Sequence, residues 1–153
     1  MSPMENELIV KGEIIIDAEP GKVWNTLTSP ERTKQYMFGC EVLSDWKVGS
    51  PVLWKGVFDG KEIVAVKGEV KAIEPCQYLA YTTIDPNADI EDIPENYTTV
   101  TYRLTSENGN TRLNITQGDF AKVANGEKRY QDTQSEGGWD GILKEIKKVA
   151  ERG

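Results

Sequence analysis

Residues 137–150 read GGWDGILKEIKKVA, and this stretch decides the fold. Its apolar residues follow one another at intervals of 3, 1, 3 and 3, the spacing of one helical face. They are Trp139, Ile142, Leu143, Ile146 and Val149. Three lysines and a glutamate occupy the opposite face. No other part of the chain has so strong a helical periodicity, and it predicts an amphipathic helix that packs by one side.

We expect this helix to begin upstream, near Gly126 to Tyr130, and to run through Gly137 and Gly138. Two glycines inside a helix cost about 1 kcal/mol each relative to alanine. They indicate either a close approach of the helix to a sheet or a break in the helix. We predict one long C-terminal helix that is kinked or closely packed at these glycines.

The rest of the chain is dominated by strand patterns. The β-branched run Ile14–Ile16 predicts a first strand within residues 8–17. Two short helices, opened by Pro20 and by Ser29-Pro30, follow it. Turn signals such as Asp59-Gly60 then separate further strands. We predict these at residues 52–58, 62–73, 78–84, 98–105 and 111–117.

Alternation within the strands predicts a sheet with one wet face. In the strand 62–73 the apolar face is predicted to hold Val64, Val66, Gly68, Val70 and Ala72. The fold class is therefore α+β, with a curved antiparallel sheet of about six or seven strands wrapped around the long C-terminal helix. We expect a single domain over residues 7–153, preceded by a flexible N-terminus at 1–6.

Composition excludes several classes of function. The 153-residue chain has a formal net charge of −7 and no histidine. The acidity opposes binding to nucleic acid and to anionic membranes, and the lack of histidine excludes Ser-His-Asp catalysis and His-ligated zinc. Cys40 and Cys76 form no CxxC pair, so we expect two free thiols, with one disulfide as the alternative. We predict no cofactor, no metal site and no identifiable catalytic residue.

No apolar run approaches the ~20 residues of a membrane helix. The polar, acidic N-terminus lacks the basic start and apolar stretch of a signal peptide. We therefore expect a cytoplasmic protein.

Several local patterns, taken in order, resemble a known family. They are Ile16-Asp17-Ala18 with Val23-Trp24, Ser29-Pro30-Glu31, Gly68-Glu69-Val70 leading to Ile73-Glu74-Pro75 and Leu79-Ala80-Tyr81, residues 111–117, and Gly138-Trp139 with Leu143. Together they resemble the helix-grip fold of the START-related (SRPBCC) superfamily. The nearest branch is that of the activator of heat-shock protein 90 ATPase homologues. In the eukaryotic co-chaperone this fold follows another domain that takes part in chaperone binding, and we see no counterpart of that domain in this sequence.

The resemblance implies a binding place between the concave face of the sheet and the C-terminal helix. The residues predicted to line or close this cavity are Trp24, Met37, Trp54, Val66, Tyr81, Tyr102, Leu104, Leu113, Ile115, Gln117, Phe120, Trp139 and Leu143. A mostly apolar lining with a few polar groups is typical of small-molecule sites. The alternative is that these side chains simply fill the core.

Gln117 is the most informative of these residues. Strand parity places its amide on the inward face, where an unpaired amide costs roughly 1–3 kcal/mol. It either orients a ligand or hydrogen-bonds a neighbouring tyrosine or a buried water. Thr83 and Thr98 share the inward parity and the same two interpretations.

The acidic segment Asp85-Pro86-Asn87-Ala88-Asp89 resembles the first half of a calcium loop. Ile90 stands where that loop needs glycine and Asn96 where it needs glutamate. We therefore interpret the segment as a solvated loop, long enough to act as a lid.

Three functions remain open. The first is a non-enzymatic domain, monomeric or homodimeric, that binds a small apolar or amphipathic ligand in the cavity. The second is a protein-interaction module, with a chaperone as partner by analogy. The third is a cyclase- or hydrolase-like enzyme, which requires an Asp, Glu, Tyr or Lys with a perturbed pKa in the cavity.

Overall fold

The computed structural model describes residues 8–37, 39–87, 90–118, 120, 123, 126–135 and 137–152. Its strands are β1 (Val10–Ile16), β2 (Glu41–Ser44), β3 (Pro51–Phe58), β4 (Lys61–Glu74), β5 (Tyr78–Thr83), β6 (Thr98–Glu107) and β7 (Asn110–Gly118). Its helices are α1 (Pro20–Thr28), α2 (Pro30–Thr33), η2 (Pro94–Asn96, a 3-10 turn), α3 (Gly126–Ser135) and α4 (Asp140–Arg152). The expected N-terminal segment 1–6 lies outside the described residues.

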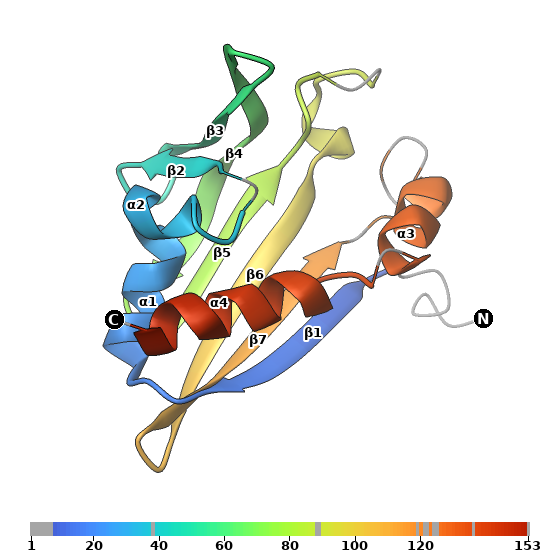
Figure 1. Cartoon of the computed structure of the whole chain (residues 1–153). Helices are drawn as coiled ribbons and strands as arrows, with labels where there is room; N and C mark the ends of the chain where they lie inside the picture. The colour runs from blue at the N-terminus through green and yellow to red at the C-terminus, as the bar shows by residue number, and fades with distance from the viewer. Residues whose placement is uncertain are drawn as a thin grey trace, which may run out of the picture.

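The strands form one seven-stranded antiparallel sheet in the order β1-β7-β6-β5-β4-β3-β2. The sheet curves around α4, which runs across its concave face, and α1 and α2 pack beyond the C-terminal end of α4 (Figure 1). This is the α+β helix-grip architecture that the strand and helix patterns predict. The short edge strand β2 is an addition, because no strand was predicted at residues 41–44.

Two parallel rows of residues on the concave face organise the interior. The cavity row joins neighbours across five strands: Val70, Tyr81, Val100, Gln117 and Val10. The core row runs beside it: Ile73, Leu79, Tyr102, Ile115 and Gly12. Side chains two residues apart point to the same face of a strand, so both rows look toward α4.

The prediction of one helix running through Gly137 and Gly138 is wrong. These glycines have φ values of 90° and 59°, in the left-handed region that glycine adopts without a Cβ clash. Gly137 N–H donates to the carbonyl of Gln134 and Gly138 N–H to that of Thr133, the bond pattern of a Schellman cap. The glycines therefore end α3, and a new helix, α4, starts at Asp140.

The predicted apolar face of β4 is only partly right. Register shifts between Trp54 and Lys55, and between Val70 and Ala72, insert extra residues into β4. Each shift of one residue turns the following side chains to the other face. As a result Ala65 and Ile73 pack against the core together with the predicted Val66. Val64 and Ala72 do not belong to that core cluster.

Gly68 marks a close approach of β4 to β5. A Cβ added to Gly68 would lie 1.6 Å from the backbone oxygen of Thr82 and 2.4 Å from its carbonyl carbon. No side chain fits at these distances, so the two strands meet here only because residue 68 is glycine.

We predict that Gly68→Ala lowers the free energy of unfolding by roughly 3 kcal/mol or more, because the backbone of β5 must move away. Urea denaturation followed by circular dichroism checks this. The matched control is Gly141→Ala in α4, where nothing lies within 4 Å of the added Cβ and alanine favours the helix. Equal effects of the two substitutions would contradict the close approach.

Candidate functional site

A cavity of about 270 Å³ lies on the concave face, beyond the N-terminal end of α4. Six residues predicted from the sequence line it: Met37, Trp54, Val66, Tyr81, Gln117 and Trp139. The sheet supplies its floor through Tyr81, Val100 and Gln117 of the cavity row, and β3 and β4 supply one wall. The segment after α2 and the residue before α4 close it from the other side.

Four further residues line the cavity: Cys40, Ala65, Thr83 and Val100. The sequence predicts that Thr83 faces inward and either orients a ligand or bonds a neighbour, and Val100 has the same inward strand parity. Ala65 reaches the cavity through the register shift in β4, which no periodicity shows. Cys40 follows a turn and carries no pattern signal.

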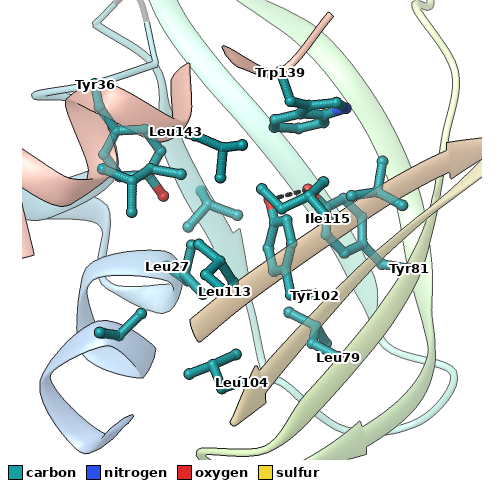
Figure 2. Close-up of a cluster of buried hydrophobic side chains, with 14 of the residues drawn as sticks. Leu27, Tyr36, Leu79, Tyr81, Tyr102, Leu104, Leu113, Ile115, Trp139 and Leu143 are labelled. Atoms are coloured by element: carbon teal, nitrogen blue, oxygen red, sulfur yellow. Dashed lines mark hydrogen bonds between the residues drawn. The ribbon is translucent and has the colours of Figure 1, made fainter. Parts of the chain in front are cut away.

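The other seven predicted residues do not line the cavity: Trp24, Tyr102, Leu104, Leu113, Ile115, Phe120 and Leu143. All seven pack in or against the hydrophobic core. Tyr102 and Ile115 belong to the core row, which α4 covers, since a Leu143 methyl lies against Gly12 of the same row. Figure 2 shows Leu143 and Leu27 in the same cluster of buried side chains as Tyr102, Leu113 and Ile115.

Two of these seven residues, Phe120 and Trp24, were candidates for closing the cavity. Both pack in or against the core instead. Phe120 is buried and makes an edge contact with the ring of Tyr130 in α3, with centroids 6.2 Å apart. Trp24 is half-buried on α1 and packs against the core. Helix packing, rather than strand parity, decides both positions.

A chain of hydrogen bonds crosses the cavity from β5 to the start of α4. The indole N–H of Trp139 donates to Gln117 Oε1 over 3.2 Å. The Gln117 amide nitrogen donates to Thr98 Oγ1 over 3.2 Å, and the hydroxyls of Thr98 and Thr83 lie 2.9 Å apart. The amide of Gln117 therefore finds its partners in a threonine and an indole. Among the described residues, these two take the place of the neighbouring tyrosine that the sequence also suggested.

The broken helix sets up this network. Trp139 lies between the two helices, and its carbonyl accepts the first bond of α4 from Leu143 N–H. A continuous helix would keep Trp139 in a regular turn. The turn at Gly137 and Gly138 instead leaves the indole beside Gln117 and edge-on to the ring of Tyr102, with centroids 6.4 Å apart.

A buried pair of tyrosines supports the cavity floor. The hydroxyls of Tyr81 and Tyr102 lie 2.7 Å apart, and their rings meet edge to face (Figure 2). Burial raises the pKa of Tyr81 well above its ordinary value and raises the pKa of Tyr102 to about 12. Burial likewise raises the pKa of Tyr36, whose hydroxyl donates to the Thr26 carbonyl. Tyr81 is therefore a neutral hydrogen-bonding group at neutral pH, unsuited to act as a base.

None of the ten described residues that line the cavity is an Asp, Glu, Lys or Arg. Burial raises the pKa of the Cys40 thiol, which keeps it protonated. Both cysteines are free. Within the described part of the chain no group of three or more Cys, Asp or Glu side chains could hold a metal ion. Ala88 and Asp89 of the acidic loop lie outside the described residues.

A second hollow of about 430 Å³ lies on the opposite side of β4 and β5. Asp92 lies there beside Lys67 and accepts a 2.6 Å hydrogen bond from the Tyr97 hydroxyl. These three polar groups satisfy one another on the protein surface. Among the described helices, none is both long and apolar enough to cross a membrane.

Comparisons with known proteins place the chain among relatives of the same fold. The family model described as Activator of Hsp90 ATPase homolog 1-like protein matches residues 17–151. The solution structure of ChR145 from Cytophaga hutchinsonii is 34% identical, with 94% of each chain covered and a TM-score of 0.71. The solution structure of the Aha1 dimer from Colwellia psychrerythraea is 18% identical, covers 94% of this chain and 96% of its own, and has a TM-score of 0.67. A search of curated proteins finds no match.

The buried tyrosines make a pH prediction. Their pKa values are higher in the folded state than the ~10 of an unfolded chain, so their contribution to stability is complete below pH ~10. It is lost as the pH rises through the folded value of about 12 for Tyr102. We expect tyrosinate absorbance at 295 nm to show late ionisation that coincides with loss of the circular dichroism signal. Tyr102→Phe should remove one late-ionising group. Ionisation of all six tyrosines near pH ~10 with the fold intact would contradict the burial of this pair.

Proposed function

This chain belongs to the Activator of Hsp90 ATPase homolog 1-like family, and we propose that it is a member that binds a small apolar or amphipathic molecule in the cavity beside Trp139. The observation that carries this proposal is the cavity itself, a hollow with no charged side chain among the described residues that line it. Its aromatic lining comes from Trp54, Tyr81 and Trp139.

The size of the cavity favours a small ligand. Its volume of about 270 Å³ lies just below the ~300–1,000 Å³ of typical ligand pockets. Burial of an apolar molecule there would be driven by roughly 25 cal/mol per Å² of apolar surface removed from water. A molecule with a single small ring fits this volume better than a long acyl chain.

Hydrogen bonds within the protein also support the proposal. The bonds between Thr83, Thr98, Gln117 and Trp139 fix the polar side of the cavity lining. The rows of the sheet fix its floor. A site that is already formed loses little conformational entropy on binding, which favours affinity.

Native mass spectrometry of the freshly purified protein, followed by calorimetric titration with small aromatic compounds, tests this proposal. We expect Val100→Phe to weaken binding at least tenfold, or about 1.4 kcal/mol, because the larger ring occupies the cavity floor. The matched control is Val48→Phe, at a side chain that is 68% exposed. Equal binding by wild type and both variants, or no binding to the folded wild type, would contradict the proposal.

A second candidate function is regulation of a chaperone ATPase. The family description and exposed apolar side chains at the β3–β4 hairpin support it. Phe58 and Ile63 share one face of the β3–β4 hairpin and are 37% and 36% exposed, while Val57, which is 68% exposed, lies on the other face. Single exposed apolar residues are common, but neighbouring ones favour a protein contact. For this function we expect the purified protein to stimulate the ATPase rate of Hsp90 and Phe58→Lys to reduce the stimulation several-fold. A rate unchanged by saturating wild-type protein would exclude it.

A further inference from the structure

The direction of each hydrogen bond at Gln117 follows from chemistry. An indole N–H can only donate, so the Gln117 atom beside Trp139 must be its amide oxygen. The amide NH₂ group therefore points to Thr98, whose hydroxyl oxygen accepts one of its hydrogens. The orientation of the amide is thus determined by its neighbours.

The network has more hydrogens than it uses. Trp139, Gln117, Thr98 and Thr83 together carry five polar side-chain hydrogens. They make three hydrogen bonds with one another, which leaves two hydrogens. One is on the Gln117 amide nitrogen and the other is on a threonine hydroxyl. Neither has a further partner among the residues that the structure describes.

Gln117 is placed to offer its remaining hydrogen to a molecule in the cavity. Its side chain lines the cavity and is only partly buried. Val100 lies next to it in the cavity row, with Tyr81 on the other side of Val100. Two strand spacings of about 4.8 Å put Gln117 and Tyr81 roughly 10 Å apart. An apolar body over Val100 can therefore carry a hydrogen-bond acceptor to Gln117.

The same lining disfavours an ionised group. No charged side chain faces the cavity among the residues described, so an anion or cation would lose its hydration without a counter-ion. Gln117 Oε1 and Thr98 Oγ1 each already accept one hydrogen bond within the network, while the two spare hydrogens have no such use there.

We propose that the cavity selects neutral molecules that combine a small apolar body with one hydrogen-bond acceptor, such as a ketone, ester or tertiary amide carbonyl, and that Gln117 is the residue that recognises the acceptor. This inference rests on the proposed ligand-binding function and adds the chemical class of the ligand to it.

Three probes of nearly the same shape test it: acetophenone, which carries a carbonyl acceptor, α-methylstyrene, which replaces that oxygen by CH₂, and benzoate, which is an anion. Binding is followed by NMR, through the side-chain amide of Gln117 and the indole N–H of Trp139. We expect acetophenone to bind wild type several-fold more tightly than α-methylstyrene and at least tenfold more tightly than benzoate.

Gln117→Glu keeps an oxygen for the Trp139 indole but removes the amide hydrogens. It should abolish the preference for acetophenone over α-methylstyrene, and Gln117→Met should do so without adding a charge. The matched control is Gln77→Glu, at an exposed position, which should leave the preference unchanged.

The outcomes separate the two proposals. If none of the three probes shifts the cavity signals of wild type, the ligand-binding function itself fails. If acetophenone and α-methylstyrene bind equally, if benzoate binds best, or if the Gln117 variants keep the wild-type preference, the inference about ligand class fails while ligand binding stands.

Discussion

The packing of α4 against β1 is the contact on which the rest of the interior depends. A Leu143 methyl carbon lies 2.7 Å from the point where a Cβ on Gly12 would be, and Trp139 Cβ lies 3.4 Å from the same point. A Cβ at residue 12 would push the Leu143 methyl aside, so glycine lets the helix pack directly on the strand. Leu143, Ile146 and Val149 are then buried over the concave face. The helix thereby covers the core row and stops short of the cavity row.

The cavity follows from where the helix begins. With Gly137 and Gly138 in left-handed conformations, α3 ends and α4 starts only at Asp140. Trp139 becomes the last residue before the helix, and its indole spans the gap to Gln117. Two glycines thus convert a segment that would otherwise pack as a continuous helix into the rim of a small polar-edged cavity. A hydrogen bond between the buried hydroxyls of Tyr81 and Tyr102 fixes these two side chains at the cavity floor.

Much of this arrangement is readable from the sequence. The spacing of Trp139, Ile142, Leu143, Ile146 and Val149 predicts α4, and strand alternation predicts that Tyr81, Tyr102, Ile115 and Gln117 share one face. These features depend on local periodicity, which burial of one face imposes. The register shifts in β4 and the choice between a kinked and a broken helix depend on contacts between distant segments. The close approach of Gly68 to Thr82 is one such contact, and the packing of Leu143 against Gly12 is another. Strand alternation shows which face a residue is on, but it does not show how far a helix extends over that face. The sequence therefore could not separate the cavity row from the core row.

The packing of α4 against β1 can be measured directly by a nuclear Overhauser experiment on a sample with labelled leucine methyl groups. We expect a strong cross-peak between a Leu143 methyl and the Gly12 α-protons, together with one between the Trp139 indole N–H and the Gln117 side chain. Leu143 methyl cross-peaks to other residues only, with an indole N–H that exchanges freely with water, would contradict this packing.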